Sequence, residues 1–418
     1  MAARRPARRR GDGIAVLRPL AVPSGTSALS LLPLLADALG GDGAVLPVPA
    51  DDARQTSLLT ASLRAGEPID DDIAVVVSTS GTTGVPKGAM LTASALTASA
   101  EATHRRLGGP GRWLLALPAY HVAGLQVLVR SVVADTTPVA VSAGFDGAEL
   151  ASAVTSLGSG RRYASLVAAQ LEKALRDPAA AAALASLDAV LIGGGPIPQG
   201  VAERASAARI SVVRTYGMSE TAGGCVYDGV PLDGVRVRVE RSATSHDGAE
   251  RSATSHDGAE GSATSNDGRV VLGGATLAKG YRNAVQPDPF AEPGWFRTDD
   301  LGAVDDSGVL RVLGRVDDAI STGGLTVLPQ LVEAALARHP AVADCAVFGV
   351  ADERLGERVV AAIVVATASA APTLAELRAH VASTLPSTAA PREVHIVGEL
   401  PRRGIGKVDR RELAARFG

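Results

Sequence analysis

The chain has 418 residues, 46% of them hydrophobic and 20% charged, which suits two or three globular domains with a large core. Its 41 basic and 44 acidic residues give a net charge of −3, and this balance argues against a general nucleic-acid-binding protein. Two cysteines are too few for a disulfide framework or a zinc cluster, and no uncharged apolar stretch reaches the roughly 18 residues that a membrane span needs.

Basic residues are distributed unevenly between arginine and lysine. Only four are lysine, namely Lys87, Lys173, Lys279 and Lys407, so each of these is a candidate for a specific role. The chain opens with a basic segment, residues 1–13, that no clean apolar run with a cleavage site follows. We therefore predict a disordered basic extension rather than a secretory signal, and a cytoplasmic protein.

Short runs rich in Val, Ile and Leu alternate with Ala-rich amphipathic stretches, which predicts an α/β fold. Residues 73–77, 189–192 and 210–213 are apolar runs of strand length, and each leads into a polar or Gly-rich loop. A helix is predicted between the last two runs, at residues 199–208. Parallel strands that each feed a loop present a binding site at their carboxyl edge, so we expect the site there.

Internal repetition occurs once, between residues 240 and 268. A ten-residue unit is present there in three copies, the last of them degenerate, and it contains no large apolar residue. Stacked copies would therefore bury nothing, unlike the units of a solenoid. Residues 235–239 before the repeat and 269–272 after it have the pattern of strands. We predict that residues 240–268 form a disordered loop between these strands.

The last hundred residues have the pattern of a separate small domain. Helices are predicted at residues 328–338 and 374–384, and strands at 343–350 and 359–365. This arrangement is typical of an α+β unit, and its length is sufficient for an independent domain. We predict a large domain over residues 14–314 and a small mobile one over residues 315–418.

The strongest local signal is the segment Thr79-Ser-Gly-Thr-Thr-Gly-Val-Pro-Lys-Gly88, which follows a predicted strand and precedes a helix-like segment. Its glycines allow backbone N–H groups to turn towards an anion, its hydroxyls add donors, and Lys87 adds positive charge. The loop therefore suits a polyphosphate. It is not a Walker loop, because no Gly-Lys-Ser/Thr triplet occurs.

This loop resembles the phosphate-loop motif of the adenylate-forming superfamily, which includes acyl-CoA synthetases, adenylation domains and luciferases. Four further segments resemble the motifs of that superfamily in its order: residues 216–221 for adenine and magnesium, 295–302 for ribose, 314–318 with Gly323 and Gly324 for the hinge, and 404–410 for the catalytic lysine. Residues 191–198 and 213–234 are most similar to the o-succinylbenzoate–CoA ligases of menaquinone biosynthesis, in their compact actinobacterial form.

The resemblance implies a fold, a reaction and a set of substrates. The fold is a large amino-terminal domain with layered parallel and mixed sheets and helices, joined by a hinge to a small α+β domain. The reaction is the ATP- and Mg²⁺-dependent ligation of an aromatic carboxylic acid to coenzyme A through an acyl-adenylate, with release of pyrophosphate and AMP. Its partners are these small molecules, without nucleic acid or a membrane span, and the resemblance also suggests a homodimer.

Roles follow from the resemblance position by position. The residues that would hold the phosphates of ATP are Thr79, Ser80, Gly81, Thr82, Thr83, Gly84 and Lys87. The residues that would surround the rest of the nucleotide are Gly193, Gly194, Gly195, Tyr216 and Gly217, with Asp300 and Arg315 on the ribose. Glu220 would bind Mg²⁺, and Thr221 would donate to the α-phosphate. Lys407 would contact both the attacking carboxylate and the α-phosphate.

The acyl and CoA sites are predicted in the same way. His121, Ser165 and Gln170 would line the acyl pocket, where any of them, or a nearby arginine, could bind the second carboxylate of the acid. Gly323 and Gly324 would line the pantetheine tunnel, and the small domain would rotate about Asp317 between the two half-reactions. The ribose motif departs from the usual Thr-Gly-Asp, because Asp299 stands in the Gly position. Either Asp299 or Asp300 could therefore hold the ribose.

Three alternatives remain open at this point. The first is a CoA ligase for another aryl acid or a fatty acid, and the second is a stand-alone adenylation domain. The third, from a different class, is an inactive nucleotide-binding protein. Against the third, the residues at both critical positions, Glu220 and Lys407, are those that the chemistry requires.

Overall fold

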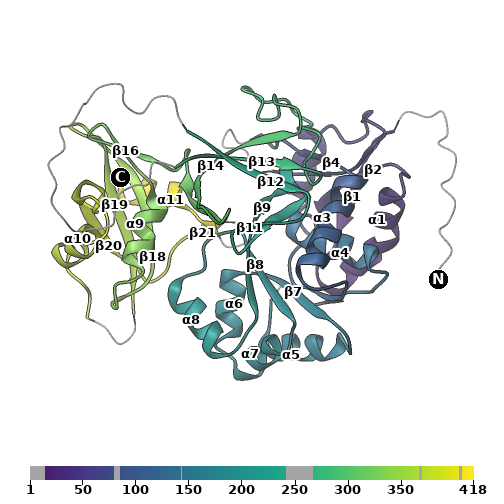
Figure 1. The fold of residues 1–418 in the computed structure, drawn as a ribbon, viewed down its shortest axis with the longest axis horizontal. Helices are drawn as coiled ribbons and strands as arrows, with labels where there is room; N and C mark the ends of the chain where they lie inside the picture. The colour runs from purple at the N-terminus through teal and green to yellow at the C-terminus, as the bar shows by residue number, and fades with distance from the viewer. Residues whose placement is uncertain (1–14, 80–84, 143, 242–266, 367–369, 404–406) are drawn as a thin grey trace. The chain divides into compact units, whose positions relative to one another are not determined.

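The computed structural model describes residues 15–79, 85–142, 144–241, 267–366, 370–403 and 407–418 (Figure 1). Residues 1–13 and most of the repeat, for which disorder was predicted, lie outside the described residues. The contacts divide the chain into two units. Unit 1 comprises residues 1–193, 204–236 and 272–296, and unit 2 comprises residues 194–203, 237–271 and 297–418. The predicted domain boundary at residue 314 stays a prediction.

Unit 1 contains a mixed seven-stranded sheet that places the predicted site residues. Its order is β11-β10-β9-β8-β7-β5-β6. The strands are β5 (Arg112–Leu115), β6 (Val139–Ala140), β7 (Arg162–Val167), β8 (Ala189–Gly193), β9 (Val212–Met218), β10 (Gly223–Tyr227) and β11 (Val230–Pro231). Strands β5 to β9 are parallel, whereas β10 and β11 are antiparallel to their neighbours. The carboxyl ends of β5, β7, β8 and β9 therefore meet at one edge.

A second sheet of unit 1 has the order β1-β2-β3-β4, formed by β1 (Leu17–Val22), β2 (Ala44–Pro49), β3 (Ile73–Val77) and β4 (Ala89–Thr92). The run at residues 73–77, now β3, was expected in one parallel sheet with the runs at 189–192 and 210–213, and this expectation was wrong. It pairs in parallel with β2 and antiparallel with β4. All five residues of β3 are buried. An apolar run of this kind indicates burial, but it does not indicate which strands lie beside it.

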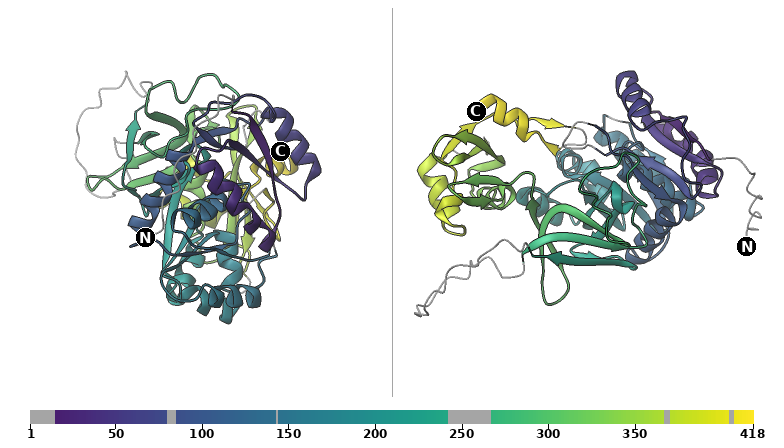
Figure 2. Two further views of the ribbon diagram at one scale, coloured as in Figure 1. Left: turned by 90° about the vertical axis from the view of Figure 1, so that its right-hand side faces the viewer. Right: turned by 90° about the horizontal axis from the view of Figure 1, so that it is seen from above.

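The helices of unit 1 are α1 (Leu32–Leu39), α2 (Ala53–Ser62), α3 (Ala93–Arg106), α4 (Val122–Val133), α5 (Gly147–Ser156), α6 (Ala168–Ala174) and α7 (Pro178–Ala185). Thr92 caps α3 by accepting a hydrogen bond from Ala95 N at 3.1 Å, and Asp52 and Asp146 cap α2 and α5 in the same way. Helices α1, α3 and α4 pack side by side; Figure 1 labels them, and Figure 2 shows this purple-to-blue part of the chain in two further views. Leu, Val and Ala dominate the core, as the low aromatic content requires.

A buried polar cluster lies between α3, α4 and β10. The guanidinium of Arg130, a residue only 3% exposed, lies 4.7 Å from the centre of the Trp113 ring and donates to Tyr227 Oη at 3.3 Å. Trp113 Nε1 donates to His104 Nε2 at 3.4 Å, so the imidazole accepts at that nitrogen. Burial, with a smaller contribution from the charge of Arg130, lowers the pKa of His104 to about 4.

We expect this histidine to make unit 1 sensitive to acid. Between pH 6.5 and pH 4 the unfolded chain binds a proton that the folded chain excludes, so the free energy of unfolding falls as the pH is lowered. From pH 7 to pH 4.5 the loss is about 2.5 kcal/mol. Urea unfolding, followed by the fluorescence of Trp113 in a Trp295→Phe background, measures it. His104→Gln should remove this part of the pH dependence, and an unchanged dependence would contradict the assignment.

A third sheet has the order β12-β13-β14-β15, formed by β12 (Val235–Glu240), β13 (Gly268–Gly274), β14 (Trp295–Val304) and β15 (Leu310–Arg315). Strands β12 and β13 are the two strands predicted on either side of the repeat, and they are neighbours in the sheet. The predicted helix at residues 199–208 is confirmed as α8 (Gln199–Ala207).

The carboxyl-terminal part of unit 2 has the predicted α+β pattern. Its sheet contains β16 (Ile320–Thr322), β17 (Leu325–Val327), β18 (Val342–Asp352), β19 (Gly356–Val365) and β20 (Glu393–Ile396), and its helices are α9 (Pro329–Leu336), α10 (Leu374–Ala382) and α11 (Arg410–Phe417). Side chains of β18 alternate between two faces. Val347 packs with residues of α9 and α10, whereas Phe348 packs with Leu413 of α11. Among the described helices, none has the length and apolar character that crossing a membrane requires.

Candidate active site

Four predicted site segments meet at the carboxyl edge of the seven-stranded sheet. His121 follows β5 and precedes α4, and Gln170 follows β7 in α6. Gly193 ends β8, and Glu220 follows β9. These residues are distant in sequence, and the parallel strands bring them to one edge of unit 1. The parallel strands therefore provide the framework for the site expected at this edge.

The turn that carries Glu220 and Thr221 is held by several hydrogen bonds. Thr221 Oγ1 accepts from Met218 N at 3.0 Å and donates to Gly223 O at 2.7 Å. Ala222 has a left-handed backbone, and its carbonyl accepts from Ser99 Oγ at 3.0 Å and from Gln126 Nε2 at 2.7 Å. Because these groups are buried, the backbone of the turn is fixed firmly. The predicted contact of Thr221 with an α-phosphate stays a prediction.

Glu220 is linked to Lys87 through a residue that sequence reasoning missed. The Glu220 side chain is buried, and its Oε1 accepts a hydrogen bond from Tyr281 Oη at 2.6 Å. Lys87 Nζ lies 5.3 Å from the centre of the same tyrosine ring, within the range of a cation–π contact. The only signal for Tyr281 in the sequence was its place two residues after the scarce Lys279. Lys279 itself pairs with Asp70 at 2.9 Å and Asp72 at 3.0 Å.

Part of the phosphate loop can be described. Thr79 is the last residue described before residue 85, and its buried hydroxyl has no hydrogen-bond partner among the described residues. Residues 80–84, and hence Ser80, Gly81, Thr82, Thr83 and Gly84, lie outside the described residues. A buried hydroxyl without a partner in the described part of the chain, at the start of a Gly-rich loop, is compatible with an anion as its partner. The chemistry of Thr79 and Lys87 therefore fits the phosphates of a nucleotide.

The described residues suit a magnesium ion at Glu220 only if the phosphates of a nucleotide supply its other ligands. Among the described residues, no three His, Cys, Asp or Glu side chains gather as a ligand set. Mg²⁺ is usually held by one or two carboxylates together with substrate phosphates, rather than by a cage of protein ligands. A single buried carboxylate matches this mode of binding.

The predicted acyl-site residues differ in how their polar groups are used. Gln170 Oε1 accepts from Val167 N at 3.2 Å and its Nε2 donates to Ala116 O at 2.8 Å, so the amide ties the ends of β5 and β7 together. Ser165 lies in β7 and is nearly buried, and the His121 ring lies 4.6 Å from that of Tyr120. Their contacts with a substrate stay predictions.

Three glycines of the nucleotide motifs lie where a side chain does not fit easily. A Cβ on Gly193 would lie 2.6 Å from Thr215 Oγ1, and one on Gly217 would lie 2.1 Å from Gly223 O. Gly194 has φ +82°, which a glycine adopts readily. Tyr216 is half-buried in β9, whereas Gly195 has open space around it.

The predicted ribose residues form an ion-pair cluster in unit 2. Asp300 and Arg315 lie opposite each other in β14 and β15, with Arg315 Nη1 3.3 Å from Asp300 Oδ1. Arg315 also donates to both carboxylate oxygens of Asp317, at 2.8 and 2.9 Å. Burial alone would lower the pKa of Arg315, but the hydrogen bonds to Asp317 and the charges of the nearby aspartates raise it. Asp299 is half exposed and pairs with Arg269 at 3.1 Å. Arg315 also pairs with Asp299, at 3.7 Å, so both carboxylates lie next to the predicted ribose arginine and only Asp300 is buried.

Lys407 lies on an exposed strand of unit 2 that is anchored close by. It begins β22 (Lys407–Val408), which pairs with β21 (Arg402–Arg403). Three residues later, Arg410 Nη2 donates to Glu333 Oε1 at 2.8 Å and its Nη1 lies 3.4 Å from Asp318 Oδ2. The lysine strand is therefore tied to the residue after the predicted hinge residue Asp317. Gly323 and Gly324 form the turn between β16 and β17, both with positive φ.

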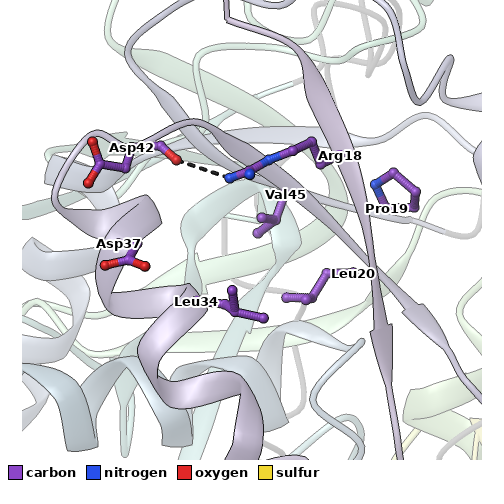
Figure 3. A pocket seen from close by; sticks show the side chains of 7 residues that line it. All are labelled: Arg18, Pro19, Leu20, Leu34, Asp37, Asp42 and Val45. Carbon is purple, nitrogen blue, oxygen red and sulfur yellow. Dashed lines mark hydrogen bonds between the residues drawn. The ribbon is translucent and has the colours of Figure 1, made fainter. Parts of the chain in front are cut away.

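Two hollows of unit 1 are lined by other residues. One, of about 310 Å³, lies against β1, β2 and α1 and is lined by Arg18, Pro19, Leu20, Leu34, Asp37, Asp42 and Val45 (Figure 3). Another, of about 400 Å³, is lined by Pro68, Ile69, Asp70, Met90 and Arg282. Neither contains a predicted catalytic or binding residue, so the hydrogen bonds and ion pairs define the site.

Comparison with known proteins identifies the class. The AMP-binding enzyme family matches residues 34–282, and its carboxyl-terminal domain matches residues 331–407. The chain belongs to the AMP-binding enzyme family. It is 65% identical to the probable 2-succinylbenzoate–CoA ligase of Mycobacterium tuberculosis, over 96% of this chain and 98% of that one. It is 32% identical to the sulfoacetate–CoA ligase of Cupriavidus necator, over 88% and 72% of the two chains.

A solved structure agrees with this class. The o-succinylbenzoate CoA synthetase of Bacillus subtilis, in complex with the acyl-adenylate OSB-AMP, matches with a TM-score of 0.69 at 26% identity. The match covers 95% of this chain and 82% of that one. The predicted fold, a large adenylate-forming region followed by a small carboxyl-terminal domain, is confirmed.

Proposed function

We propose that this chain is a 2-succinylbenzoate–CoA ligase of menaquinone biosynthesis. It would activate the acid with ATP to an acyl-adenylate, releasing pyrophosphate, and then transfer the acyl group to the thiol of coenzyme A, releasing AMP. The observation that carries the proposal is the 65% identity to the Mycobacterium tuberculosis ligase over nearly the full length of both chains.

Family membership alone does not select the acid. At 32% identity the chain also resembles a ligase named for sulfoacetate, an acid without an aromatic ring. The much higher identity to the 2-succinylbenzoate relative favours that acid, and a CoA ligase for another aryl or fatty acid is the alternative. The cytoplasm, where ATP and coenzyme A are available, is the proposed place of the reaction, and a homodimer stays a prediction.

The residues in place suit chemistry without a protein nucleophile. Burial raises the pKa of Cys225 to about 12 and raises that of Cys345 as well, so neither forms a thiolate readily. In this proposal the protein positions the substrates and offsets negative charge as it grows on phosphorus. Lys87 and Mg²⁺ on Glu220 would act on the phosphates, Asp300 and Arg315 on the ribose, and Lys407 on the α-phosphate and the carboxylate.

The acid is tested by comparing kcat/KM for 2-succinylbenzoate, benzoate, octanoate and sulfoacetate, with thioester formation as the readout. A site built to hydrogen-bond a second carboxylate rejects analogues that lack it, so we expect a preference of about 100-fold or more for 2-succinylbenzoate. Faster turnover of benzoate, octanoate or sulfoacetate would replace this proposal with the alternative ligase.

A further inference from the structure

Tyr281 belongs to a segment that is held firmly beside the phosphate loop. Met90 N donates to Gly280 O at 3.0 Å, Arg282 N to Gly88 O at 2.8 Å, and Asn283 N to Lys87 O at 3.0 Å. The segment 279–283 thus pairs with the chain that leaves the loop, although the two are about 190 residues apart. The backbone of Tyr281 is therefore fixed relative to that of Lys87.

The Tyr281 ring is held from the side. Phe290 meets it edge-on, with the ring centres 5.4 Å apart, and Phe296 lies 4.7 Å from Phe290. The chain has only five Phe, five Tyr and two Trp, so three of its few aromatic side chains gather at this one place. This packing limits the positions that the hydroxyl can take.

Packing alone does not explain a tyrosine here. A phenylalanine would make the same ring contacts, and it would also present a ring face to Lys87. The hydroxyl adds the 2.6 Å hydrogen bond to the buried Glu220 carboxylate, a charge-assisted bond of the stronger kind. The function of the hydroxyl is therefore to be sought at Glu220.

We infer that Tyr281 is a positioning residue for the nucleotide-bound metal. Its hydroxyl orients the Glu220 carboxylate, and its ring face holds Lys87 on the same side, so that one side chain sets both charged groups that meet Mg²⁺ and the phosphates. The inference rests on the proposed function, because it assigns Glu220 and Lys87 to the nucleotide. The backbone of Glu220 is fixed separately, through the carbonyl of Ala222, so that Tyr281 acts on the side chain.

This role predicts a specific effect on Mg²⁺. A carboxylate that loses this hydrogen bond is held less firmly, and the cost of ordering it weakens metal binding, as the loss of outer-shell partners commonly does by about 10- to 100-fold. For Tyr281→Phe we expect the Mg²⁺ concentration that half-saturates ATP binding to rise about tenfold. ATP binding without Mg²⁺ should change less than about twofold, because the ring beneath Lys87 is kept.

The test titrates Mg²⁺ into the full chain with ATP and follows nucleotide binding by calorimetry, so it does not depend on the acid. Tyr163→Phe is the matched control, because the Tyr163 hydroxyl donates to Gly109 O at 2.9 Å and serves no proposed site. Tyr281→Leu, which also removes the ring face, should weaken ATP binding without Mg²⁺ as well. Thermal unfolding of all variants shows whether each one folds.

The outcomes separate the inference from the proposed function. An unchanged Mg²⁺ requirement in Tyr281→Phe, or an equal rise in Tyr163→Phe, overturns the role of Tyr281. A wild-type chain that binds ATP and Mg²⁺ but ligates none of the acids overturns the proposed function and leaves the Mg²⁺ comparison valid. A wild-type chain that binds no ATP overturns both.

Discussion

Replacement of Lys407 by alanine is expected to abolish acyl-adenylate formation, by about a thousandfold, and to leave thioester formation from supplied acyl-adenylate within a few-fold of wild type. In the proposed reaction the lysine charge offsets the charge that develops on the α-phosphate while the carboxylate attacks. Thiol attack on the finished adenylate does not need it. Lys407 is exposed at the start of β22, so truncation should not disturb a core.

The measurement separates the two half-reactions. Pyrophosphate release reports the first, and consumption of synthetic acyl-adenylate by coenzyme A reports the second. Lys173→Ala is the matched control, because Lys173 is also a scarce lysine but donates to Gly144 O at 2.7 Å on the surface. Equal loss of both half-reactions in Lys407→Ala would contradict the assigned role. Acyl-adenylate formation at the wild-type rate in this variant would contradict it as well.

The second large effect is expected at Glu220. Glu220→Gln keeps the size of the side chain and an oxygen that can accept from Tyr281, but it removes the negative charge proposed to hold Mg²⁺. We expect adenylation to fall by about 100- to 1,000-fold at ordinary Mg²⁺ concentrations. Part of the loss should be recovered when the Mg²⁺ concentration is raised.

Pyrophosphate release measured across a range of Mg²⁺ concentrations tests this prediction. Glu101→Gln provides a control, because Glu101 is an exposed carboxylate whose charged neighbour is Arg105, at 3.9 Å. A Glu220→Gln variant with wild-type rates and a wild-type Mg²⁺ requirement would show that the metal is held elsewhere.

Local sequence patterns were sufficient for most of the secondary structure but not for the pairing of its strands. The apolar run of β3 identified a buried strand, yet its partners β2 and β4 are set by contacts that no local pattern records. By contrast, the strands now labelled β8 and β9 were expected in one parallel sheet with a helix between them, and they pair in parallel.

The site shows the same limit. The motifs pointed to Glu220 and Lys87 individually, but Tyr281, the residue between them, is 61 positions from Glu220 and has no periodic pattern around it. The place of Gln170 at the acyl pocket stays a prediction, and composition and spacing could not reveal that its amide bonds two backbone groups. Asp299 and Asp300 both pair with Arg315, and Asp299 pairs with Arg269 as well; the sequence motif could not reveal these contacts, which strand register creates.

The central claim is that this chain makes a thioester of 2-succinylbenzoate through an acyl-adenylate. The most direct measurement is the product balance with purified protein, ATP, Mg²⁺, coenzyme A and this acid. We predict equal amounts of AMP, pyrophosphate and thioester, and, without coenzyme A, accumulation of acyl-adenylate together with pyrophosphate. Formation of ADP and phosphate, or pyrophosphate release that does not depend on the acid, would contradict it.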